Sequence, residues 1–190
     1  LMRDPRSIRF THDFSRQWLR LGELGRFPPD KKLYPTYDAA LQRSMFAESQ
    51  RYFERMFQEN LPVKEFLDSN WSMLNNRLGQ HYGVEGIEDF ASRHVTFDRE
   101  DHRGGVLTQA SILTLTSDGF RHRPVHRGKW ISEVILGVIP PPPPPNAGTL
   151  AATDGSTANR SLRARLEAHR AQASCAACHD KIDPFGFAWE

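Results

Sequence analysis

Hydrophobic residues in the first part of the chain recur at helical spacing. An aromatic stripe runs from Phe10 through Phe14 to Trp18 and continues at Leu21. Such spacing at i, i+4 and i+8 predicts a helix over residues 5 to about 22 that buries one face.

A second amphipathic segment extends from about Thr36 to about Asn60, before Pro62, and is expected to be the longest helix. Its apolar side is formed by Leu41, Met45, Tyr52, Phe53, Met56 and Phe57. The residues expected to face solvent are Arg43, Glu48, Arg51, Glu54 and Arg55.

Shorter segments complete a mainly α pattern. Further helices are expected over residues 63–67, 71–81, 106–116 and 124–136, with a last one capped by Ser161, and a brief strand over residues 94–97. The apolar run 106–116 fits a strand as well as a buried helix, because periodicity does not separate the two in so short a segment. Helix is the preferred interpretation.

Six consecutive prolines, Pro140 to Pro145, interrupt this pattern. They predict a polyproline II rod about 19 Å long. We interpret this rod as a spacer rather than as a docking motif for an SH3-like partner. The following residues are rich in Ala, Thr, Gly and Ser and read as loop. We therefore expect a helical body over 1–139, a polyproline and flexible linker over 140–158, and a small C-terminal segment over 159–190.

Composition narrows the function classes. The 190 residues are 38% hydrophobic and 25% charged, which is typical of a globular protein rather than a disordered one. A net charge of +2 gives no support to nucleic-acid binding. No apolar run is long enough for a membrane span. We also find no Ser-His-Asp order, phosphate loop or close carboxylate pair that would indicate a hydrolase or a kinase.

The chemistry is concentrated in the pentapeptide Cys175-Ala-Ala-Cys178-His179, which holds both cysteines of the chain. This Cys-x-x-Cys-His spacing is the attachment motif of haem c. Cys175 and Cys178 are predicted to form thioethers to the porphyrin, and His179 is predicted to be the proximal iron ligand.

Three other interpretations of the cysteines are weaker. A structural zinc site needs four ligands, and the chain has no second cysteine pair. A thioredoxin-like dithiol follows a strand, whereas the residues before Cys175 read as a helix. A simple disulfide leaves His179 without a role.

Neighbouring residues are candidates for haem packing. Leu162, Leu166 and His169 share one face of the last helix, and His169 is a possible propionate contact. Asp183-Pro184 reads as a turn that brings Phe185 and Phe187 back as an apolar wall for the porphyrin. Such a wall would raise the redox potential.

The sixth iron ligand stays open. The candidates are Met2, Met45, Met56, Met73, His81, His94, His102, His122, His126 and His169. His122 and His126 have the spacing of a metal pair, but Pro124 places His122 before the helix. The basic residues around them, Arg121, Arg123, Arg127 and Lys129, form either a solvated face or an anion-binding patch.

Several motifs together resemble the large secreted planctomycetal cytochrome c domain proteins, whose function is mostly unassigned. The resemblance is carried by Phe14-Ser-Arg-Gln-Trp-Leu19, Leu74-Asn-Asn-Arg-Leu-Gly-Gln-His-Tyr-Gly83, Arg103-Gly-Gly-Val-Leu-Thr-Gln-Ala-Ser111, Pro124-Val-His-Arg-Gly-Lys-Trp130, the proline run, Leu166-Glu-Ala-His-Arg170 and the segment Cys175 to Ala188. It implies an exported, multidomain haem protein, periplasmic or extracellular, of which this chain is an internal portion truncated at its C-terminus. Further domains, including another haem domain upstream, are implied as well.

Two functions are consistent with this resemblance and with the motif. The first is electron transfer by a six-coordinate haem c to or from a redox partner protein. The second is a haem enzyme, peroxidase-like or oxidase-like, with an open distal site. A structural or docking role within a larger multihaem complex is compatible with either.

Overall fold

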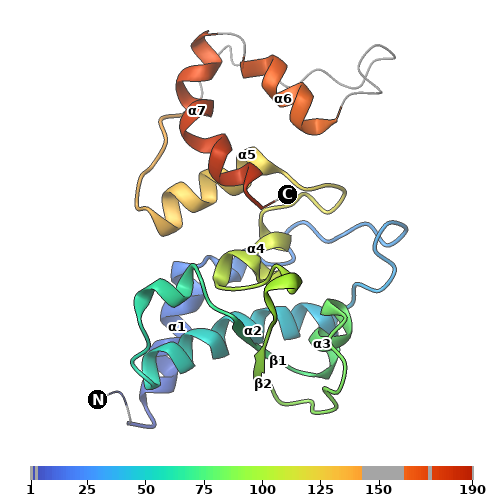
Figure 1. Cartoon of the computed structure of the whole chain (residues 1–190), viewed down its shortest axis with the longest axis vertical. Helices are drawn as coiled ribbons and strands as arrows, with labels where there is room; N and C mark the ends of the chain where they lie inside the picture. The colour runs from blue at the N-terminus through green and yellow to red at the C-terminus, as the bar shows by residue number, and fades with distance from the viewer. Residues whose placement is uncertain (1, 3, 143–160, 171–172, 190) are drawn as a thin grey trace. The chain divides into compact units, whose positions relative to one another are not determined.

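The computed structural model describes residues 2, 4–142, 161–170 and 173–189. The chain divides into two compact units, unit 1 over Leu1–His122 and unit 2 over Arg123–Glu190. The described residues form seven α-helices and two short strands (Figure 1). The expected mainly α class is therefore confirmed.

The boundary between the units lies earlier than the expected end of the helical body at residue 139. The helix that begins at Pro124 packs on the C-terminal helix, and both belong to unit 2. Most of the expected polyproline and flexible linker, including the end of the proline run, lies outside the described residues.

Unit 1 begins with two helices that pack on each other. The elements up to residue 66 are α1 (Ser7–Trp18), the 3-10 turn η1 (Leu21–Glu23), α2 (Ala39–Gln58) and the 3-10 turn η2 (Val63–Phe66). Asp38 caps α2 by accepting a hydrogen bond from the backbone N–H of Leu41 at 2.6 Å. These bounds agree with the two helices expected from the periodicity.

The rest of unit 1 is made of short elements. They are β1 (Trp71–Leu74), α3 (Asn76–Tyr82), β2 (Arg93–Thr96), the 3-10 turns η3 (Arg99–Asp101) and η4 (Val106–Thr108), and α4 (Ala110–Leu115). The strand expected near residue 94 is present. The ambiguous segment 106–116 is not a strand, but it is helical only in two pieces, η4 and α4, with Gln109 between them in an extended conformation.

The helix expected over 71–81 is wrong in its first half. Residues 71–74 form β1, which pairs antiparallel with β2 so that Trp71 lies opposite Thr96. Asn75 has an extended backbone and its side chain caps α3 through the N–H of Leu78 at 3.0 Å. Trp71 stacks on Tyr52 with ring centroids 4.2 Å apart. This long-range packing overrides the local helical pattern.

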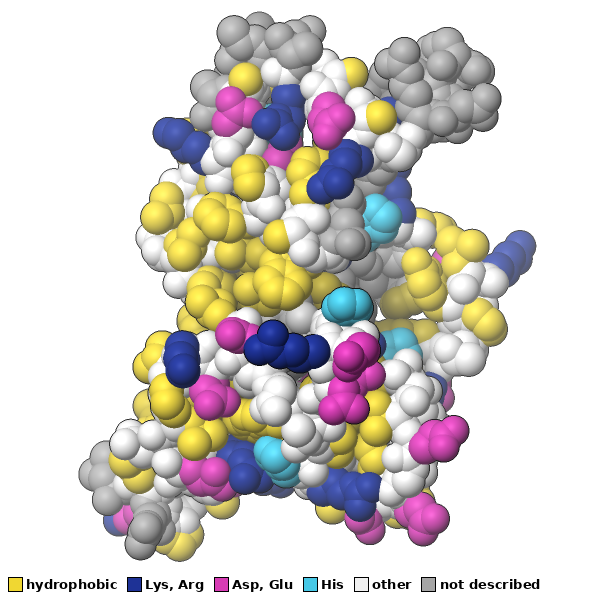
Figure 2. Space-filling view, viewed as in Figure 1, with side chains coloured by type: hydrophobic (Ala, Val, Ile, Leu, Met, Phe, Trp, Pro, Cys, Tyr) yellow, Lys and Arg dark blue, Asp and Glu magenta, His cyan; other side chains and the backbone are white. Residues whose placement is uncertain are grey.

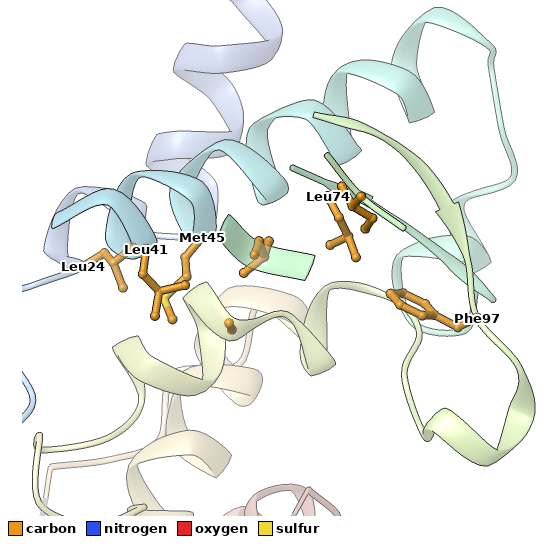
Figure 3. Packing of buried hydrophobic residues seen from close by; sticks show 8 residues of the cluster. Leu24, Leu41, Met45, Leu74 and Phe97 are labelled. Atoms are coloured by element: carbon orange, nitrogen blue, oxygen red, sulfur yellow. The ribbon is translucent and has the colours of Figure 1, made fainter. Parts of the chain in front are cut away.

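The core of unit 1 joins segments far apart in the sequence. Leu24, Leu41 and Met45 lie together at one end of this cluster (Figure 3). The remaining buried members are Leu74, Leu78, Ile87, Phe97 and Ala110. Full burial of a large apolar side chain stabilises a fold by roughly 1.5–3 kcal/mol, so the segments that supply this cluster depend on one another.

The aromatic stripe of α1 is covered only in part, contrary to expectation. Phe10 is 52% exposed and Phe14 is 43% exposed, although Phe14 still packs against Phe53 of α2 at 5.1 Å between ring centroids. The fully buried positions of the helix are Thr11 and Ser15. Their hydroxyls donate to backbone carbonyls one turn earlier, so small polar side chains fit the tight contact without unpaired groups.

Two glutamates on α2 that were expected to face solvent are buried. Glu48 accepts hydrogen bonds from the Ser72 hydroxyl and from the Tyr82 hydroxyl, both at 2.7 Å. Burial raises the pKa of Glu48 to about 7. Glu54 accepts a hydrogen bond from Arg51 at 2.6 Å. Specific polar partners therefore allow charged positions to enter the core, which periodicity alone does not reveal.

Unit 2 contains α5 (Pro124–Trp130), the π-helical turn η5 (Ile131–Ile135), α6 (Leu162–Arg170) and α7 (Ala173–Phe187). Helices α5 and α7 pack against each other (Figure 1). A Cβ atom on Gly128 would lie 2.1 Å from the carbonyl oxygen of Ile182, and one on Gly186 would lie 1.9 Å from that of Pro124. The two helices therefore run antiparallel in direct backbone contact.

Basic and acidic side chains are interspersed on the face shown in Figure 2, in keeping with the small net charge. Among the described helices none has both the length and the apolar character needed to cross a membrane.

We predict that Gly186→Ala destabilises unit 2 by roughly 1–3 kcal/mol, because the added methyl group overlaps backbone that has no room to move. Gly22→Ala is the matched control, since its Cβ would meet only the Arg16 side chain at 3.7 Å. Urea unfolding followed by circular dichroism measures both. Equal stability of the two variants would contradict the close crossing.

We also predict that burial of Glu48 makes stability depend on pH. Its pKa is raised from 4.5 to about 7, so the folded state keeps a proton that the unfolded chain releases. Its contribution is fully present below about pH 4.5 and is lost as the pH rises through about 7, by up to roughly 3 kcal/mol. Glu48→Gln removes this loss.

Free energies of unfolding at pH 5 and pH 8 check this prediction. From pH 5 to pH 8 the free energy of unfolding falls in the wild type, and this fall is smaller in Glu48→Gln. In the exposed control Glu88→Gln the fall is the same as in the wild type. A difference between Glu48→Gln and the wild type that stays constant with pH would show that Glu48 is already ionised at pH 5.

Candidate functional site

Helix α7 carries the three residues of the predicted attachment motif. Cys175, Cys178 and His179 lie at positions i, i+3 and i+4 of one continuous helix. Residues with this spacing project from the same face. The helix therefore presents two sulfur atoms and an imidazole on one side, which is the arrangement that the motif requires.

Cys175 and Cys178 are not joined to each other in a disulfide, and both are partly exposed. A thiol that adds to a porphyrin vinyl group has to be reduced and accessible. The placement of the two side chains is compatible with that reaction.

The imidazole of His179 is held by a carboxylate on the next turn of the same helix. The Nδ1 atom of His179 lies 3.0 Å from Oδ1 and 3.2 Å from Oδ2 of Asp183. The His179 side chain is 20% exposed, whereas that of Asp183 is fully buried. An ionised carboxylate only accepts hydrogen bonds, so Nδ1 carries the proton and Nε2 keeps its lone pair.

Arg170 at the end of α6 lies beside the same carboxylate. Its guanidinium group makes a 2.7 Å ion pair with Asp180 and lies 3.9 Å from Oδ2 of Asp183. The buried charge of Asp183 is thus bonded directly to His179 and balanced at longer range by Arg170.

The expected turn at Asp183-Pro184 is wrong, because both residues lie inside α7. Pro184 lacks the N–H that would bond to the carbonyl of Asp180, yet the helix continues to Phe187. Residues two apart in a helix leave it on nearly opposite sides. Phe185 and Phe187 therefore do not form a single wall, and their contact with haem stays a prediction.

Each of these two rings has a different surrounding. Phe185 is 40% exposed. Phe187 lies under the guanidinium group of Arg163, which is 4.8 Å from the ring centroid. The side chain of His169, the possible propionate contact, lies outside the described residues.

The donor set fits haem c, because two thiols and an imidazole on one helix face are the groups that the attachment motif uses. In the same unit, the indole Nε1 of Trp130 on α5 is buried and has no hydrogen-bond partner among the described residues.

One expected member of the basic patch around residue 126 does not lie on the surface. Arg127 is buried and donates a hydrogen bond to the backbone carbonyl of Trp189 at 2.8 Å, so it supports the fold rather than a solvated face. Arg121 and Lys129 pair with Asp118 and Glu133.

The sixth iron ligand stays open. Met45 and Met56 are buried in the core of unit 1, and His94 stacks on Trp71. His126 lies on α5 within unit 2. The other described candidates belong to unit 1. In the described part of the chain, no group of three or more His, Cys, Asp or Glu side chains is arranged to hold a metal ion by itself.

Sequence reasoning missed Asp183 as a functional residue and treated it only as part of a turn. The signal was present, because Asp183 follows His179 by four residues and the two side chains meet if the helix continues. Pro184 obscured this signal, since proline is usually a sign that a helix ends.

Two family models match the chain. Residues 103–190 match PSCyt3, a protein of unknown function (DUF1588), and residues 1–84 match PSD4, a protein of unknown function (DUF1592). Both are planctomycete cytochrome c-associated domains, in agreement with the resemblance seen in the sequence. No curated protein and no solved structure matches the chain.

Proposed function

We propose that unit 2 carries one covalently bound haem c and that the protein transfers single electrons to or from a redox partner protein. The observation that carries this proposal is the shared face of Cys175, Cys178 and His179 on α7, with the His179 ring oriented by Asp183. The match of residues 103–190 to a cytochrome c-associated domain supports it.

Each residue has a distinct task in this proposal. Cys175 and Cys178 anchor the group through thioether bonds, and His179 offers Nε2 to the metal. When bound, haem c supplies reversible one-electron oxidation and reduction. Asp183 keeps the imidazole in one orientation, so little of the protein has to rearrange when an electron arrives or leaves.

The proposed location follows from the chemistry. Bacteria attach haem c covalently outside the cytoplasmic membrane, so we propose that the protein works in the periplasm or the extracellular space. The redox partner would then be another exported electron carrier. The donor set by itself is equally compatible with an open distal position and catalysis at the iron, so the spectrum has to decide between transfer and catalysis.

Covalent attachment is the first prediction of this proposal. The chain, produced in an export-competent host with haem c maturation, will give a pyridine haemochrome spectrum of the c type. Mass spectrometry will place the haem on the peptide that contains Cys175 and Cys178. The double variant Cys175→Ala, Cys178→Ala will lose covalent haem to background.

Asp180→Asn is the matched control for attachment, because Asp180 lies on the same helix, one residue beyond the motif, and its side chain is 59% exposed. It will keep wild-type haem content. A wild-type protein that leaves the same host colourless, with free or bridged thiols and no iron, would contradict the proposed function.

The second prediction separates transfer from catalysis. With both axial positions filled by protein, reduced protein will show a low-spin spectrum that carbon monoxide does not change, and oxidised protein will not respond to cyanide. A high-spin spectrum that responds to either ligand would reject electron transfer as the main role and favour the enzyme. Absorption spectroscopy of the purified wild-type protein is sufficient for this measurement.

A further inference from the structure

Asp183 has a place in unit 2 that haem attachment alone does not require. Its side chain is fully buried, and it lies within one helical turn of Gly186, where α5 and α7 touch. Burying a carboxylate is costly unless its charge is bonded or balanced. Its closest polar partner among the described residues is the Nδ1 atom of His179 at 3.0 Å.

We propose that Asp183 is the positioning residue that sets the redox potential of the haem, by orienting His179 and by making its imidazole a stronger electron donor. This inference rests on the proposed function, because it concerns the ligand that His179 provides. It adds a direction, since a charged acceptor on Nδ1 favours the ferric state and lowers the redox potential relative to a neutral acceptor.

Orientation is the first part of the argument. A histidine bound through one ring nitrogen is fixed by the hydrogen bond that its other N–H makes. In α7 this bond comes from a side chain on the next turn of the same helix. The hydrogen-bond partner that sets the imidazole plane and the tautomer is therefore supplied by α7 itself.

Charge is the second part. A backbone carbonyl would accept the same hydrogen bond, but it carries no net charge. The carboxylate draws the proton of Nδ1 more strongly, which raises the electron density on Nε2 and stabilises the more positively charged ferric iron. Because Asp183 is fully buried, water does not screen this charge. The effect opposes the rise in potential that an apolar surrounding produces.

Arg170 moderates the same charge. Its Nε atom lies 3.9 Å from Oδ2 of Asp183, which is too long for a hydrogen bond but close enough for attraction between the charges. Its hydrogen bond goes to Asp180 instead, at 2.7 Å. Arg170 therefore leaves the carboxylate bonded to His179 and lowers the effective negative charge beside the imidazole.

Two substitutions will shift the potential in opposite directions. Asp183→Asn keeps the shape of the side chain and removes the charge, so the potential will rise. The ratio of ferrous to ferric haem at the wild-type midpoint will increase about tenfold, the difference between a charge-assisted and a neutral hydrogen bond. Arg170→Gln will lower the potential. It will do so less in the Asp183→Asn background, where the charge that it balances is gone.

The experiment uses the whole chain matured with haem in an export-competent host. Haem content is measured first by the pyridine haemochrome method, then the midpoint potential by spectroelectrochemistry, and then the g values of the ferric protein by electron paramagnetic resonance. Asp183→Asn will retain haem, and its g values will shift because weaker electron donation by His179 changes the ligand field of the iron. Asp183→Glu, which keeps the charge, will lie close to the wild type in potential and in g values.

The control is Glu167→Gln, which removes an equal charge from an exposed position of α6 in the same unit. The inference is overturned if Asp183→Asn retains haem without a rise in potential, or if Glu167→Gln raises the potential as much. If Asp183→Asn does not mature, Asp183→Glu and Arg170→Gln decide, because an unchanged potential in Arg170→Gln also overturns it. A wild-type protein without haem overturns the proposed function itself, and haem content identifies that outcome separately.

Discussion

The direct backbone contact between α5 and α7 is the constraint on which the candidate site depends. Gly128 and Gly186 remove the side chains that would hold the two helices apart, and each glycine faces a carbonyl of the opposite helix. At this separation there is no room for water between the helices. The carboxylate of Asp183, within a turn of the crossing, is therefore kept from solvent and directed to His179. The close packing that Gly128 and Gly186 allow is thus linked to the burial of the Asp183 carboxylate.

The two units solve the problem of a buried carboxylate in different ways. In unit 1, Glu48 receives hydrogen bonds from two neutral hydroxyls, and burial raises its pKa to about 7. In unit 2, Asp183 is bonded to an imidazole and lies near a guanidinium group. The direct partners therefore differ, two hydroxyls in unit 1 and an imidazole in unit 2, although Arg103 also lowers the pKa of Glu48 by charge attraction, as an arginine lies near Asp183. The first arrangement suits a structural role, and the second acts directly on a group that can bind a metal.

Much of the helical fold follows from sequence, and the exceptions have identifiable causes. Helix α2 was predictable because a long apolar period and the Asp38 cap agree. Strand β1 was not, because Trp71 is fixed by rings from other parts of the chain, Tyr52 and His94. The common helix face of Cys175, Cys178 and His179 follows from their spacing, and their role in haem attachment stays a prediction. The contact of Asp183 with His179 was not predictable, because proline usually ends a helix. Here α7 continues past Pro184.

The family matches and the structural units divide the chain at different places. The PSCyt3 match begins at residue 103, whereas unit 2 begins at Arg123. The residues between these two points include Val106, Ala110 and Ile112, which are buried in unit 1. Ala110 belongs to the same cluster as Leu41 of α2, within the segment that matches PSD4. The core of unit 1 takes side chains from both matched segments. The buried side chains of each segment therefore pack partly against side chains of the other. The start of the PSCyt3 segment is therefore part of the fold of unit 1, and the two segments have to be present together for that core to be complete.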